Sequence, residues 1–234
     1  MFFLLLEVIP RWGLRNPVSM MSHLLGAVLG VAALAALLWR AQRRGADSRA
    51  VWALAVYGVS MTLGFAASAL FHTPMVSAEE LAVFKKLDHA GIFVMIAGTG
   101  TALCGALRTR WAGPMTVALW AVCLGAIAIK MVVWPMPLWL TALMYVAVGW
   151  CTLIGLFVIV RAIGWRRIQP LFWGAAVLTL GAAVFALRWP ILWPGVVEGH
   201  EVFHMLALIG ASIHFAFIYE SCTAPEGLVA AGVA

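Results

Sequence analysis

Two histidines four residues apart, in the segment Gly199-His200-Glu201-Val202-Phe203-His204, are the residues of this chain best suited to chemistry. On a helix they lie on one face, one turn apart, which is the spacing at which two imidazoles bind one metal ion. The string also reads HExxH, a pattern typical of soluble zinc peptidases with the glutamate as general base. Here it runs into apolar residues 205–219, so the pair is predicted at the mouth of a membrane helix.

Three further polar residues complete a candidate zinc site. Catalytic zinc is commonly held by three imidazoles with a fourth position open to water, and His72 can supply the third ligand beside His200 and His204. Asp88 is predicted to hydrogen-bond that water. Ser68 lies one turn before His72 on the same helical face, where its hydroxyl can orient the ligand or the water. Two structural alternatives remain open, namely that Asp88 caps a helix and that Ser68 bonds to its own helix.

The composition places these residues in a membrane. Of 234 residues, 65% are hydrophobic and 10% are charged, and the mean hydropathy is +1.03, far from the balance of a soluble domain. Because one helical crossing takes about 20 apolar residues, the chain has room for about seven. The predicted fold class is therefore an all-α polytopic membrane protein, a seven-transmembrane-helix bundle with a zinc site at one membrane face.

The chain divides into three predicted parts. Residues 1–17 are an interfacial lead-in without the features of a removable signal peptide, residues 18–219 form the seven-helix domain, and residues 220–234 form a short, flexible tail. A polar connector, residues 75–87, precedes the third span. The seven spans are predicted at about residues 18–39, 50–71, 88–107, 113–133, 138–160, 171–187 and 200–219.

Counting the crossings brings the polar residues together. Because consecutive helices alternate in direction, the first span's start, the second span's end and the starts of the third and seventh spans share one membrane face. Spans four to six contribute almost nothing ionisable apart from Lys130, and burying a charge in hydrocarbon costs roughly 3 kcal/mol. Polar residues gathered at one depth therefore indicate a functional site. Those at the four ends are Ser22, His23, Ser68, His72, Asp88, His89, His200 and His204.

The remaining histidines and the cysteines lie outside the predicted ligand set. His23 and His89 are spare ligand candidates, and His89, which directly follows Asp88, is predicted to be an interface residue. His214 lies ten residues beyond His204, about 15 Å deeper, so it is predicted to hydrogen-bond to a neighbouring helix. The four cysteines show no CxxC pairing, so we assign them neither disulfides nor a metal.

Four ordered motifs resemble those of the haemolysin III family, the bacterial branch of the progestin and adipoQ receptor family. The resemblance spans about residues 16–219, and its motifs are Asn16 to Gly26, Ser68 to His72, Leu87 to Thr99 and His200 to His204. It implies a seven-helix bundle with zinc bound by His72, His200 and His204, and with Ser68 and Asp88 around the zinc-bound water. The receptor members are similar to alkaline ceramidases and are thought to hydrolyse lipid amides. Bacterial members are linked to haemolysis by name and otherwise to membrane homeostasis.

The basic residues bear on location and orientation. The net charge of +6 is spread over the loops, so we expect membrane lipids as partners and no nucleic acid, with the protein in the plasma or inner membrane. The loops after spans one, three and five hold nine of the fifteen basic residues, which favours a cytoplasmic location for these loops and an outside location for the zinc face. The receptor branch, by contrast, places its amino terminus in the cytoplasm.

Three functional hypotheses follow. The first is a zinc-dependent hydrolase of a lipid amide or ester, with Asp88 as the proton acceptor. The second is a non-enzymatic protein of membrane homeostasis or a cytolytic protein, in which zinc is structural. The third is an intramembrane metallopeptidase with Glu201 as base. Glu201 lies about 100° around the helix from His200, and this hypothesis leaves His72 and Ser68 unexplained. The sequence predicts neither a substrate nor an oligomeric state.

Overall fold

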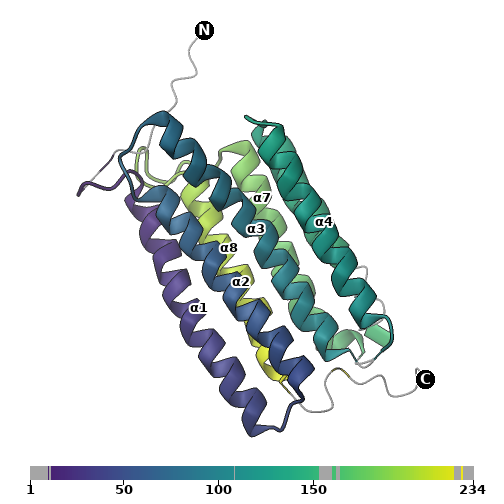
Figure 1. Cartoon of the computed structure of the whole chain (residues 1–234). Coiled ribbons are helices and arrows are strands. Elements are labelled where there is room, and N and C mark those ends of the chain that lie inside the picture. Colours follow the sequence, from purple (N-terminus) through teal and green to yellow (C-terminus); the bar gives the residue numbers. More distant parts are fainter. Residues whose placement is uncertain are drawn as a thin grey trace.

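The computed structural model describes residues 10, 12–107, 109–152, 160–161, 164–223 and 228. These residues form helices and no regular strand (Figure 1). The helices of the described residues are α1 (Pro17–Arg43), α2 (Ser48–His72), α3 (Ala78–Ala106), α4 (Ala112–Val132), α5 (Leu138–Cys151), α7 (Trp165–Leu187) and α8 (Gly199–Ser221).

Six of these helices are long and apolar enough to cross a bilayer, namely α1, α2, α3, α4, α7 and α8. Helix α5 has 14 described residues and is followed by the C-cap Thr152. The rest of the predicted fifth span, residues 153–159, lies outside the described residues. The all-helical, multi-pass class is therefore confirmed, while the count of seven crossings stays a prediction.

The described helices pack as a closed ring. Each helix contacts the next along the chain, α5 contacts α7, and α8 returns to α1. Figure 1 shows α1, α2, α3 and α4 side by side in this order, with α7 and α8 behind them. Helix α3 also contacts α5 and α8, so it lies toward the interior of the bundle. Large apolar side chains such as Trp52 and Val117 are exposed on the outside, as expected of a surface that faces lipid.

The starts and ends of most helices lie close to the predicted ones. Helix α2 begins after Asp47, whose side chain accepts a hydrogen bond from the backbone N of Ala50 at 2.9 Å, a typical N-cap. Helix α7 begins at Trp165, six residues before the predicted start, and carries Pro170 inside it. Pro170 removes one backbone hydrogen bond near the start of α7 but does not end the helix.

The start of α3 differs most from the prediction. Ser77, not Asp88, is the N-cap, and a capping box joins it to Glu80, whose backbone N donates to Ser77 Oγ at 3.3 Å. Most of the predicted polar connector is therefore helical, and that prediction was wrong. Asp88 lies in the third turn of α3, ten residues after Ala78, so it does not cap the helix.

Candidate metal centre

Three imidazoles converge where α2 ends and α8 begins. The Nε2 atom of His200 lies 3.2 Å from Nε2 of His72 and 3.1 Å from Nε2 of His204. One ligand atom from each of the three lies within 4.8 Å of the others. His72 and His204 are 2% and 1% exposed, which means that the cluster is shielded from bulk water on most sides. The sequence prediction that these three histidines meet is confirmed.

Two of the three nitrogen separations are close to those of a metal site. Nitrogens bound tetrahedrally at about 2.0–2.1 Å from one ion lie about 3.3–3.4 Å apart, close to the observed separations of 3.1 and 3.2 Å. The Nδ1 atom of His72 lies 3.1 Å from Oδ1 of Asn16, and because an amide oxygen only accepts, Nδ1 must carry the hydrogen. The Nε2 lone pair of His72 is then free for a metal, so this cluster can hold one.

Asn16 and Arg15 fix the end of α2 that carries His72. The backbone N of Asn16 donates to the carbonyl of His72 at 3.1 Å, and Arg15 Nη2 donates to the carbonyl of Phe71 at 2.5 Å. These bonds satisfy carbonyls that a helix end leaves free. The residues that precede them in the predicted lead-in, 1–9 and 11, lie outside the described residues. Asn16 was not predicted as a partner of His72, although its pairing with Pro17 at a helix start is visible in the sequence.

Ser68 and Asp88 face each other one turn deeper than His72. Helices α2 and α3 approach closely at Gly64 and Gly91, because a Cβ added to Gly91 would lie 3.1 Å from Gly64 Cα. One turn along α2 from Gly64 and one turn back along α3 from Gly91 reach Ser68 and Asp88. The Ser68 side chain interacts with the Asp88 carboxylate. The Ser68 hydroxyl is buried and makes no well-formed hydrogen bond with any described group.

A cavity of about 160 Å³ runs from these residues into the bundle. Its outer end is lined by His23, Ser68 and Asp88. Thr99, which lines its deeper part, lies eleven residues beyond Asp88 on α3, which is about 16 Å along the helix. The cavity therefore connects the neighbourhood of the three histidines with the middle of the membrane.

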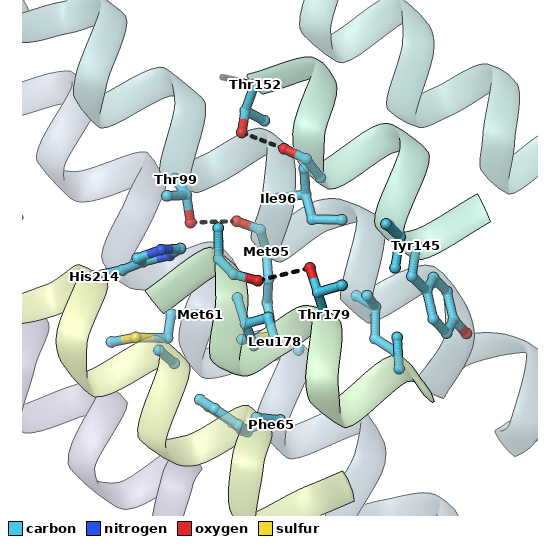
Figure 2. A pocket seen from close by; sticks show the side chains of 18 of the residues that line it. Met61, Phe65, Met95, Ile96, Thr99, Tyr145, Thr152, Leu178, Thr179 and His214 are labelled. Atoms are coloured by element: carbon cyan, nitrogen blue, oxygen red, sulfur yellow. Dashed lines mark hydrogen bonds between the residues drawn. The ribbon is translucent and has the colours of Figure 1, made fainter. Parts of the chain in front are cut away.

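The deep part of this cavity presents an apolar surface. Figure 2 shows the hydroxyls of Thr99, Thr152 and Thr179 hydrogen-bonded to backbone carbonyls, with Met61, Phe65 and Leu178 around them. His214 is bonded to the carbonyl of Leu171 on α7 at 3.1 Å, which confirms its prediction as a core histidine. With their hydrogens engaged, these groups leave a space that suits a hydrocarbon chain better than an ion.

His23 and His89 lie near the cluster without belonging to it. The ring of His23 stacks on His204 with a centroid distance of 3.7 Å and an interplanar angle of 17°, so it packs against a ligand. Both of its nitrogens are buried without a hydrogen-bond partner among the described groups. His89 is 6% exposed and meets Trp134 and Tyr145 edge-on. The prediction of His89 as an interface residue was wrong, because the longer α3 places it inside the bundle.

Glu201 has a structural partner on another helix. Its Oε1 accepts from Ser19 Oγ on α1 at 2.8 Å, and its Oε2 accepts from the backbone N of Glu198 at 3.1 Å. The residue is 1% exposed. Both carboxylate oxygens are engaged in joining α1 to the start of α8, which leaves the metallopeptidase hypothesis without its general base.

Comparison with known proteins assigns the chain to a protein family. The model of the family described as haemolysin-III related matches residues 13–215. The chain belongs to the haemolysin III family. Among its relatives, Hemolysin-3 of Bacillus cereus is 29% identical over 198 residues, covering 83% of this chain and 85% of that protein. The Hemolysin-3 homolog of Bacillus subtilis (strain 168) is 25% identical over 202 residues, covering 86% and 91%.

This haemolysin III family member is a multi-pass membrane protein. The six apolar helices and the family match agree on that location, and the plasma membrane fits a family with these bacterial members. The family match begins at residue 13 and so includes Asn16 and every histidine of the candidate metal centre.

Proposed function

We propose that this protein is a zinc-dependent hydrolase that cleaves an amide or ester bond of a membrane lipid. The observation that carries the proposal is the convergence of His72, His200 and His204 beside an apolar cavity, whose lining residue His23 stacks on His204. A lipid can place its hydrocarbon chain in such a cavity and its polar bond near the histidines. Imidazole ligands without a thiolate suit zinc among the available divalent metals.

The residues of this chain have separate roles in the proposed reaction. The three histidines hold the metal, and Asn16 keeps the Nε2 lone pair of His72 available. Bound zinc would supply a nucleophile at neutral pH and polarise the carbonyl of the scissile bond. Asp88, 8% exposed at the cavity's outer end, accepts a proton on its carboxylate, and Ser68 orients that carboxylate from the facing helix.

An assay of the purified protein tests this proposal. Incubation in detergent or nanodiscs with a panel of ceramides and acyl esters should release fatty acid, and chelation of the metal should stop the release. Asp88→Asn, which keeps the shape but removes the proton acceptor, should lower the rate by about 10²–10⁴-fold while the zinc content stays unchanged. A protein that is inactive on the whole panel, with or without zinc, would contradict the proposal.

The alternative is a non-enzymatic membrane protein in which zinc is structural. One observation favours it: the ligands come from the end of α2 and the start of α8, so a bound ion would join two helices that are distant in sequence. A stably folded Asp88→Ala protein separates the two proposals, because Asp88 is not a ligand. Retention of the cellular phenotype in that variant would favour structural zinc, and its loss would favour the hydrolase.

A cytolytic role is suggested by the name of the Bacillus cereus relative, Hemolysin-3. The described part of the cavity offers it little support, since its lining is mainly apolar. Dye release from liposomes by the purified protein tests this role directly.

The metallopeptidase hypothesis is tested by Glu201→Gln. This variant should leave any hydrolase activity largely intact, whereas a metallopeptidase would lose its general base and its activity.

A further inference from the structure

Three lysines surround Trp134 at the same membrane face as the three histidines. The Nζ atoms of Lys85, Lys86 and Lys130 lie 5.8, 5.4 and 5.8 Å from the centroid of the Trp134 ring. Lys85 and Lys86 come from α3, Lys130 from the end of α4, and Trp134 from the turn between α4 and α5. We call these four residues the Trp134 cluster. The ring of His89 meets the same indole edge-on, with a centroid distance of 5.8 Å.

Lys130 is the least expected member of the Trp134 cluster, because it is 1% exposed. Its Nζ donates to Thr141 Oγ1 on α5 at 2.5 Å, whereas an ammonium group carries three donors. A buried ammonium is costly unless it is paired with an anion. Among the described residues, no carboxylate lies within 4.0 Å of any of the three lysine nitrogens. Asp88 interacts with Lys85 only at longer range.

The place of the Trp134 cluster in the membrane indicates what can neutralise it. Lys85 lies three residues before Asp88 on α3, about 4.5 Å nearer to the membrane surface, and Trp134 follows the end of α4. Tryptophan and lysine at such positions are typical of the headgroup level. Lysines there usually extend into water, but the buried Lys130 does not. The neighbouring outer face of α4 exposes Ile129 and Val132 and can accommodate acyl chains.

We propose that the Trp134 cluster binds the phosphate of an anionic phospholipid from the leaflet that faces the candidate metal centre. The phosphate oxygens would accept hydrogen bonds from the half-buried Lys85 and Lys86, while the buried Lys130 would add its positive charge. The indole would pack against the lipid backbone. The acyl chains would lie along the outer face of α4. This lipid is distinct from any hydrolase substrate, so the site does not depend on the proposed function.

Native mass spectrometry of the protein released from mixed micelles tests the proposal. The micelles contain equal amounts of phosphatidylglycerol and phosphatidylcholine, and the measured quantity is the ratio of the two lipids retained. The wild type should retain phosphatidylglycerol preferentially. Lys85→Gln/Lys86→Gln should lower the ratio by about 25-fold and Lys130→Met by about fivefold, because one basic residue near an anionic lipid contributes roughly 1 kcal/mol.

The matched control removes the same number of charges from the other end of the bundle. Arg166 and Arg167 are exposed at the start of α7, and Arg166→Gln/Arg167→Gln should leave the ratio unchanged. A fall in the control equal to that of the lysine variants would overturn the proposal, as would a wild type without preference. If Lys130→Met does not stay monodisperse, the Lys85→Gln/Lys86→Gln variant decides alone, since both of its positions are only half-buried.

Free phosphate is the competing source of the same chemistry. An excess of inorganic phosphate, added at constant ionic strength with chloride as the comparison, should not displace phosphatidylglycerol. A lipid occupant gains additional affinity from its acyl chains along α4. Displacement by phosphate, but not by chloride, would show that the Trp134 cluster recognises a soluble anion and would overturn the assignment to lipid.

Discussion

The two ends of the helix ring use polar residues in opposite ways. At the metal-site end, His72, His204 and Glu201 are 1–2% exposed. His72 contacts His200 of α8, and Glu201 accepts a hydrogen bond from Ser19 of α1. At the other end, Arg40 pairs with Glu220 at 2.7 Å, with side chains that are 20% and 66% exposed. Burial, more than the number of polar groups, therefore distinguishes a functional site from charge that only sets orientation in the membrane. An exposed ion pair contributes little to protein stability, so its loss should be tolerated.

Acidification should produce the largest difference between the two ends, because only the metal-site end depends on histidine protonation. Each histidine must lose its proton to bind the metal, so zinc affinity should fall as pH decreases below the ligand pKa values, approaching three log units per pH unit for three ligands. The Arg40–Glu220 end contains no such requirement. Competition with a zinc-chelating dye over a series of pH values measures the slope. An affinity that does not change with pH would contradict three-histidine ligation.

Loss of Glu201 should destabilise the protein far more than loss of Glu220. Glu201→Ala leaves the Ser19 hydroxyl and the Glu198 amide without their partner, at a cost of about 2–5 kcal/mol. Glu220→Ala removes a largely exposed partner and should cost about 0–1 kcal/mol. Thermal unfolding in the same detergent compares the two variants. Equal losses of stability would mean that burial does not distinguish the two ends.

Asn16 should influence metal affinity although it is not a ligand. Removing the group that orients a ligand histidine typically lowers affinity by about 10–100-fold, and this is the loss expected for Asn16→Ala. Asn16→Asp keeps an acceptor for His72 Nδ1 and should restore most of it. Gln42→Ala, the matched control at the other end of α1, should have no effect. Zinc titration measures all three, and an unaffected Asn16→Ala would remove Asn16 from the site.

A small effect is expected for Arg40→Gln. The lost ion pair with Glu220 should cost less than about 1 kcal/mol, and the cost should shrink as salt is added because the pair is exposed. Thermal unfolding at low and high ionic strength checks both statements. A larger loss of stability that does not depend on salt would mean that this end stabilises the fold more than its exposure predicts. The same substitution also removes the stacking of Arg40 on Tyr219, at 4.2 Å, and the hydrogen bond from Arg40 Nε to Thr223, and these contacts would then account for the larger loss.

The sequence predicted the three-histidine meeting because the i,i+4 spacing of His200 and His204 and the alternation of helices are local rules. The start of α3 was missed, although the capping pattern of Ser77 and Glu80 was a readable signal. The bond from His72 to Asn16 was not predictable in the same way. It joins residues 56 positions apart and depends on how the lead-in folds over the end of α2.

In the described part of the predicted tail, a long-range contact was likewise not predictable from local sequence rules. Leu228 is 2% exposed, and its backbone N donates to the carbonyl of Ala106 at the end of α3 at 2.7 Å. Composition alone indicated a flexible segment there. Packing of a single apolar residue into a gap between helix ends leaves no periodic signal in the sequence. The same is true of Lys130, whose burial follows from the contact with Thr141 on α5.

Metal analysis of the purified protein, combined with anomalous scattering at the zinc edge, tests whether the three histidines bind zinc. We expect about one zinc ion per chain, bound by His72, His200 and His204 at about 2.0–2.1 Å without a cysteine ligand. The ion should be lost in His72→Ala, His200→Ala and His204→Ala and retained in His214→Ala. If His23→Ala removes the zinc while His72→Ala keeps it, the assigned ligand set is wrong.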